Sequence, residues 1–205
     1  MKGIIGIDLA GMPNNKTGIA ILEGCRVKTK VAFYDEEIIG EVYSYFAGTE
    51  KGLILIDAPL SEPLKGKSRI CEKALRRLGI RVFPCMFAGM KKLTKRGVEF
   101  ARLLRSQGFE VIETYPGSAQ DILNIPRKGK NPKLLRDALI QYGIKGDIKV
   151  DITDHELDAI TCAIVGKMYL EGKTVALGTY KEGFMIVPKF PTLDVMFTER
   201  GEVKP

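Results

Sequence analysis

Residues 3–10, Gly-Ile-Ile-Gly-Ile-Asp-Leu-Ala, decide the fold of this chain. A short apolar run of this length, rich in β-branched residues and ended by a turn-rich stretch, predicts a buried strand. Asp8 interrupts that run, although a carboxylate in a buried strand has an appreciable desolvation cost. Residues 53–56, Leu-Ile-Leu-Ile, lead to Asp57 in the same way. We therefore expect two buried strands that each end in an acid.

The segments around these strands predict an order of elements. Residues 17–22 and 26–34 flank a short glycine-containing connection, so the first three strands should form an antiparallel meander. A helix at 35–47 supplies the crossover that a parallel strand at 53–57 requires, which places that strand beside the first. Further elements are expected as helices at 69–78, 93–107 and 132–142, a short helix after residue 117, a strand at 109–114 and a late hairpin from 175–177 and 184–187.

Size and composition narrow the class of protein. The 205 residues fit one α/β domain, which we place at 1–188 and follow with a C-terminal tail at 189–205. No apolar run approaches the ~20 residues of a membrane span and no signal peptide is evident, so we expect a cytoplasmic protein without a membrane partner. With four dispersed cysteines and one histidine, a zinc site is not expected.

A late helix has the clearest start in the sequence. Thr153 and Glu156 have the spacing of a capping box, which predicts a helix over residues 154–170. Within it Asp154 and Asp158 are four residues apart, and His155 lies three residues before Asp158. Side chains with these spacings line one side of a helix, so the three polar groups can converge on one point.

The acids of strands and helix predict a metal site. Asp8 and Asp57 end apolar strands, and Glu113 ends a third apolar face formed by alternate residues of the strand at 109–114. Carboxylates gathered within ~4–6 Å repel one another and call for a cation. Oxygen ligands without cysteines or paired histidines suit Mg²⁺ or Mn²⁺. Glu113, Asp154 and His155 also have structural interpretations, such as a helix-dipole contact for Asp154.

Positive charge indicates the partner. A net charge of +7 makes polyanions natural partners, because lysine and arginine neutralise phosphates. A solvated basic face that keeps the protein soluble is the alternative interpretation. Arg69, close after the Asp57 loop, is the preferred phosphate contact. The full set of expected nucleic-acid contacts is Arg69, Lys92, Arg96, Arg127, Lys128 and Lys130.

Five motifs together resemble a family of predicted nucleases with a ribonuclease H-like fold, over residues 3 to about 188. They are Gly-Ile-Asp-Leu-Ala-Gly at 6–11, Ile-Asp-Ala-Pro at 56–59, Arg-Ile-Cys-Glu at 69–72, Tyr-Pro-Gly at 115–117 and His-Glu-Leu-Asp-Ala at 155–159. The last motif is also similar to the metal-binding helix of Holliday-junction resolvases. Those enzymes commonly have Glu after the fourth strand, where this chain has the shorter Asp57.

The resemblance implies a mixed sheet, three antiparallel strands followed by parallel strands, with helices on both faces. It also implies two-metal hydrolysis of phosphodiester bonds in DNA or RNA. Asp8 would bridge two cations, Asp57 would hold one, and Asp158 with Asp154 or Glu113 would hold the other, beside His155 as a catalytic group. A homodimer is compatible with such an activity.

Two other functions fit the same order of elements. One is an ATP-binding phosphotransferase domain similar to actin and the sugar kinases, which open with an Asp-x-Gly hairpin faintly matched by residues 8–11. Those proteins pair two such domains around the nucleotide, and this chain has length for one. The other is a non-catalytic nucleic-acid-binding module that keeps its acids for structure.

Overall fold

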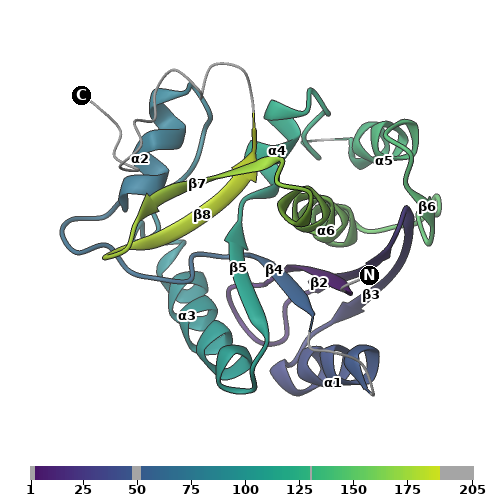
Figure 1. Ribbon diagram of the computed structural model, residues 1–205, viewed down its shortest axis with the longest axis horizontal. Coiled ribbons are helices and arrows are strands. Elements are labelled where there is room, and N and C mark those ends of the chain that lie inside the picture. Colours follow the sequence, from purple (N-terminus) through teal and green to yellow (C-terminus); the bar gives the residue numbers. More distant parts are fainter. Residues whose placement is uncertain (1–2, 48–51, 130, 190–205) are drawn as a thin grey trace.

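A single mixed β-sheet organises the protein (Figure 1), whose computed structural model describes residues 3–47, 52–129 and 131–189. Within these residues the sheet has eight strands in the order β6-β3-β2-β1-β4-β5-β8-β7. Their bounds are β1 Ile4–Asp8, β2 Thr17–Glu23, β3 Arg26–Ala32, β4 Leu53–Asp57, β5 Glu110–Thr114, β6 Lys145–Gly146, β7 Thr174–Thr179 and β8 Gly183–Pro188.

The strand directions confirm the expected fold class. β1, β2 and β3 are antiparallel neighbours, whereas β4 runs parallel to β1 and β5 parallel to β4. β8 continues the parallel part beside β5, and the preceding strand β7 pairs with it in antiparallel direction to form the late hairpin. The two-residue strand β6 at the edge beside β3 was not expected, because so short a segment has no periodicity to reveal it. The fold is ribonuclease H-like.

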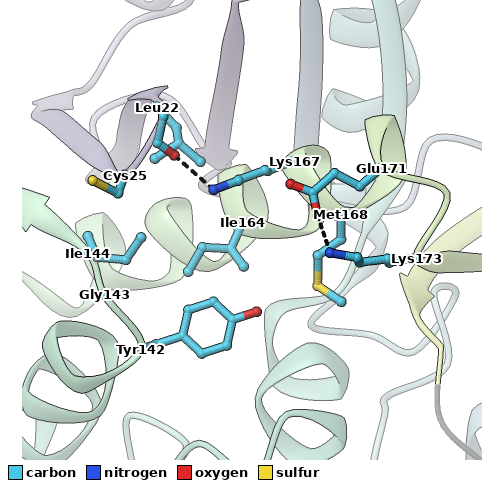
Figure 2. A pocket seen from close by; sticks show the side chains of 11 residues that line it. Leu22, Cys25, Tyr142, Gly143, Ile144, Ile164, Lys167, Met168, Glu171 and Lys173 are labelled. Atoms are coloured by element: carbon cyan, nitrogen blue, oxygen red, sulfur yellow. Dashed lines mark hydrogen bonds and ion pairs between the residues drawn. The ribbon is translucent and has the colours of Figure 1, made fainter.

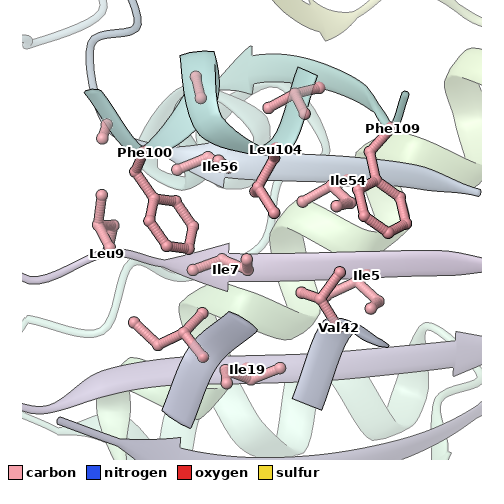
Figure 3. Close-up of a cluster of buried hydrophobic side chains, with 14 of the residues drawn as sticks. Ile5, Ile7, Leu9, Ile19, Val42, Ile54, Ile56, Phe100, Leu104 and Phe109 are labelled. Atoms are coloured by element: carbon pink, nitrogen blue, oxygen red, sulfur yellow. The ribbon is translucent and has the colours of Figure 1, made fainter. Parts of the chain in front are cut away.

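Helices cover both faces of the sheet (Figure 1). α1 and α3 pack on one face, where Ile5, Ile7, Ile54 and Ile56 of the central strands form a core with Phe100 and other apolar residues of these helices (Figure 3). α6 packs on the opposite face, and α2 covers the late hairpin. The bounds are α1 Asp35–Phe46, α2 Ile70–Arg77, α3 Lys91–Ser106, α4 Pro116–Ile122, α5 Pro132–Gln141 and α6 Asp154–Leu170.

α6 lies unusually close to the sheet because glycines face it. A Cβ on Gly6 would stand 2.0 Å from the carbonyl oxygen of Ala159, and one on Gly18 would stand 2.1 Å from that of His155. Neither distance is physically accessible, so only glycine permits this approach. The helix is buried over residues 157–166, and its N-terminal turns are held against the ends of β1 and β2.

No helix within the described residues is long and apolar enough to cross a membrane. The expected C-terminal tail lies, apart from its first residue, outside the part of the chain that the structure describes.

Candidate functional site

β1 and β4 end side by side, each in an aspartate. Asp8 and Asp57 are direct partners in the parallel register, so their side chains leave the sheet on the same face. It is the face of Gly6, on which α6 packs. Asp8 is 8% exposed and Asp57 is partly exposed at the end of its strand. The fold thus brings both predicted acids to one point at the carboxyl edge of the sheet.

The start of α6 adds two more groups. The Thr153 hydroxyl accepts a hydrogen bond from the Glu156 amide, and the Glu156 carboxylate accepts one from the Thr153 amide, which confirms the capping box. This cap begins the helix directly over Gly18, the partner of Asp8 in the antiparallel register. His155 Nδ1 lies 2.8 Å from Asp8 Oδ2 as a result. Asp158, one turn further along, is buried at 5% exposure.

Lys128 and Gln120 complete the cluster from α4 and the loop that follows it. The Lys128 ammonium is 2.7 Å from Asp158 Oδ2 and 3.8 Å from Asp154 Oδ2. Gln120 donates a hydrogen bond of 2.8 Å to the other oxygen of Asp158. Sequence reasoning placed Lys128 on phosphates and missed Gln120. The only feature of the sequence that pointed to Gln120 was its position in the short helix at the Tyr-Pro-Gly motif.

Asp57 has a strongly raised pKa. Burial raises the pKa of its carboxyl well above the ordinary value, and the neighbouring carboxylates of Asp8 and Asp158 raise it further. Among the described residues no group donates a hydrogen bond to the Asp57 carboxylate. This acid is therefore crowded by two others without a partner of its own.

The other members of the cluster have partners. Burial raises the pKa of Asp158, while the charge of Lys128 opposes that rise. The hydrogen bond to Asp8 raises the pKa of His155, which favours the imidazolium form. Asp8 and Asp158 are thus each in an ion pair with one basic side chain. Asp57 is in none of the ion pairs of the described residues, although the charge of Lys128 partly opposes the rise of its pKa.

The donor set fits a hard divalent cation. Carboxylate oxygens from β1, β4 and α6 are the ligands that Mg²⁺ and Mn²⁺ prefer. Within the described segments no three acidic, histidine or cysteine side chains already stand as a ready ligand set. Lys128 and His155 instead hold Asp158 and Asp8 in ion pairs. A cation bound by Asp158 Oδ2 would have to displace the Lys128 ammonium from that oxygen.

Glu113 does not join this cluster, which corrects the expectation for both Glu113 and Arg69. Glu113 is the register partner of Ile56, so it leaves the sheet on the face opposite to Asp57. There its carboxylate receives two hydrogen bonds from the Arg69 guanidinium, of 2.7 and 2.5 Å, and one from the Leu60 amide. Arg69 is 1% exposed and also binds Glu72. A guanidinium so enclosed cannot contact a phosphate.

Two more of the expected phosphate contacts are engaged within the protein. Arg96 is buried, bonds to Asp35 and donates a hydrogen bond of 2.6 Å to the carbonyl of Ala10, so it holds the segment after β1. Arg127 pairs with Asp121 and lies over the Tyr115 ring. The expectation for Arg96 is corrected, because its buried guanidinium is used by internal partners, whereas Arg127 stays partly exposed and its phosphate contact remains a prediction.

The last two expected contacts have different outcomes. Lys92 is exposed on the first turn of α3, where its ammonium lies 3.5 Å from the Met12 sulfur. Lys130 lies outside the described residues. Lys92 therefore remains available to a phosphate from solvent.

A cavity of about 330 Å³ lies at the other end of α6 (Figure 2). Tyr142, Met168 and Lys167 are among its lining residues, and Lys167 donates a hydrogen bond to the carbonyl of Gly24. Lys167 follows Asp158 by nine residues along α6, a rise of roughly 14 Å at 1.5 Å for each residue. No predicted site residue lines this cavity.

Comparison with known proteins agrees with the motif-based expectation. A family model described as "Protein of unknown function (DUF429)" matches residues 6–182. The chain belongs to this family. The matched region contains all three acids of the cluster and both of its basic side chains. A search of curated proteins found no match.

One of the solved structures similar to this chain is that of Thermus thermophilus RuvC. It is 13% identical, with a TM-score of 0.44 over 83% of this chain and 96% of that chain. The likeness is distant, and the assignment of the fold rests on the strand order and directions themselves.

Proposed function

We propose that this protein is a divalent-metal-dependent nuclease whose cations are held by Asp8, Asp57 and Asp158. The main support for this proposal is the Asp57 carboxylate. It lies beside two other acids at a strand end and receives no hydrogen bond from the described residues. A structural acid would have a donor, as Glu113 has on the other face.

The charges of the cluster support a cation. Asp154 joins the three acids through its contact with Lys128, so four carboxylates face the two basic groups Lys128 and His155. Even with His155 protonated, the cluster keeps an excess of negative charge. In a partly buried site, a cation held by several oxygens removes that repulsion.

The chemistry divides between cations and side chains. Divalent cations bound there would supply the charge that activates water and stabilises the leaving oxygen of a phosphodiester. His155 is fixed by Asp8 at Nδ1 and is partly exposed, so its other nitrogen is placed to exchange a proton with the reacting oxygens. Lys128, freed from Asp158, would bind a phosphate oxygen of the substrate.

Nucleic acid is the proposed substrate because exposed positive charge flanks the acids. Lys91, Lys92 and Lys95 are all exposed on the first turns of α3, and Lys92 contacts the loop that follows β1. The position of these lysines next to the Asp8 loop suits a phosphate backbone that crosses the site.

Substituting Asp8 tests the proposal. We expect Asp8→Asn to lose Mg²⁺- or Mn²⁺-dependent cleavage of DNA or RNA by about 100-fold or more, because the residue would contact the cations directly. Asp137→Asn, an exposed acid on α5, is the matched control and should cleave normally. Circular dichroism checks that both variants fold. Full activity of Asp8→Asn would overturn the proposal.

A further inference from the structure

A second pocket, of about 190 Å³, opens directly beside Asp57. Asp57 and Thr114 line it from the adjacent ends of β4 and β5, and Tyr115 follows Thr114 at its wall. The opposite wall comes from the segment before α3, through Phe83 and Met90. The pocket thus adjoins the acid cluster and shares one residue with it.

The size and lining of this pocket favour a single neutral ring. Pockets that enclose whole drug-sized ligands occupy ~300–1,000 Å³, so this one has room for one ring system with the rest of the ligand outside. Its apolar walls are Val82, Phe83, Met90, Leu93, Tyr115 and Met185.

The polar end of the pocket argues against an anion. Asp57, Glu72 and Glu113 all contribute to the lining, and the charge of the one arginine there, Arg69, is already held by the two glutamates. A phosphate or carboxylate entering the pocket would meet these acids without a free cation. A neutral base can instead donate hydrogen bonds from its N–H groups to these carboxylates.

Two exposed aromatic rings stand at the pocket. Phe83 is 67% exposed and Phe87 is 50% exposed, and their rings are stacked with centroids 6.0 Å apart and planes 15° from parallel. Two adjacent exposed phenylalanines form an apolar patch of the kind that can mark a ligand-binding groove. Parallel aromatic faces beside a positively charged track are typical of proteins that bind single-stranded nucleic acid.

α3 supplies that track. Leu93 points into the pocket, whereas Lys91, Lys92 and Lys95 of the same turns are exposed. A nucleotide whose base enters the pocket would therefore lie beside the turns of α3 that carry these lysines and beside Asp57 of the acid cluster.

We propose that this pocket takes one unpaired base of a single-stranded nucleic acid, stacked on Phe83, and so places the neighbouring phosphodiester at the acid cluster. The inference rests on the proposed nuclease function and names its substrate class. A base inside a duplex is stacked and paired, and it would have to leave the helix to enter.

Binding without cleavage tests this proposal. The probe is a short oligonucleotide carrying 2-aminopurine, prepared as single-stranded DNA, as single-stranded RNA and as a DNA duplex of the same sequence. It is titrated with the full chain in EDTA, and anisotropy gives the affinity while 2-aminopurine fluorescence reports stacking. We expect tighter binding of a single-stranded probe than of the duplex, with quenching of the fluorescence.

Variants of Phe83 connect the binding to the pocket. Phe83→Ala should weaken single-strand binding by about fivefold or more and remove the quenching. Phe83→Tyr should restore both, because it keeps the aromatic face. Tyr142→Ala is the matched control, an exposed aromatic residue of the distant cavity in Figure 2, and should bind as the wild type does.

The outcomes separate this inference from the nuclease. Equal or tighter binding of the duplex, or unchanged affinity of Phe83→Ala, would overturn the base pocket even if the wild type cleaves with Mg²⁺. Phe83-dependent binding and quenching, in a protein that cleaves nothing with either metal, would support the pocket and contradict the nuclease.

Discussion

Asp57 bears the energetic cost of the acid cluster. Its folded-state pKa is raised by burial first and then by Asp8 and Asp158, so the folded protein binds this proton more tightly than the unfolded chain does. Stability without metal is therefore fully present below the ordinary Asp pKa of about 4 and falls as the pH rises through the folded-state value. The site is less stable in the ionised state that a cation needs.

Removing the Asp57 charge should make the metal-free protein more stable. We expect Asp57→Asn in EDTA to unfold with a free energy about 1–3 kcal/mol higher than the wild type near neutral pH, because the repulsion is gone. The difference should disappear in acid, where the wild-type carboxyl is protonated. Thermal denaturation across pH measures this, and equal pH dependence of the two proteins would contradict the prediction.

Lys128 competes with a cation for Asp158. Lys128→Met should lower the free energy of unfolding in EDTA by about 1 kcal/mol or more, because a partly buried ion pair is lost. The rise in melting temperature on adding Mg²⁺ should be larger than in the wild type, since the cation no longer displaces an ammonium. Lys149→Met, at an exposed loop lysine, is the control. A smaller Mg²⁺ effect in Lys128→Met would count against the competition.

At the scale of elements, the approach of α6 to β1 and β2 builds the site. Gly6→Ala puts a methyl group 2.0 Å from the Ala159 carbonyl, so the helix must shift. We expect a loss of at least about 2–3 kcal/mol in the free energy of unfolding. Gly40→Ala is the matched control in α1, where a Cβ meets nothing within 4 Å, and it should stabilise by about 0.5–1 kcal/mol. Urea denaturation of both variants decides between these outcomes.

The elements also show what sequence can and cannot predict. The apolar runs before Asp8 and Asp57 predicted both strands and their shared edge, and the capping box predicted the first residue of α6. Glu113 also ends an apolar face formed by alternate residues of its own strand, yet its side chain lies on the face of the sheet opposite to Asp57. Its face depends on the register between β4 and β5, where a shift of one residue reverses every side chain. Nothing in one sequence fixes that register.

The basic residues were harder to assign for a related reason. An ion pair can join residues far apart in the chain, as with the buried pair of Arg69 and Glu113 or the partly buried pair of Arg96 and Asp35. Their partners become evident only when the strands and helices are packed. Composition indicated a basic surface, but it could not separate the arginines that brace the fold from the exposed lysines of α3.

At the scale of the whole molecule, the net charge of +7 sets how a polyanion binds. Affinity for single-stranded nucleic acid should fall linearly with the logarithm of salt concentration, because each phosphate contact releases a counterion. Replacing Lys92 with Met should make this slope shallower by less than about one unit. Anisotropy titrations at several salt concentrations measure both slopes. A salt-independent affinity would contradict a role for the α3 lysines.

A titration with Mn²⁺, followed by electron paramagnetic resonance, tests most directly whether the acids at the ends of β1 and β4 hold a divalent cation. The free-ion signal should fall as wild-type protein is added, and Asp57→Asn should bind Mn²⁺ at least about tenfold more weakly, because it lacks the unpartnered carboxylate. Asp137→Asn should behave as the wild type does. Equal Mn²⁺ affinity of the wild type and Asp57→Asn, or no binding by the wild type, would contradict the metal site.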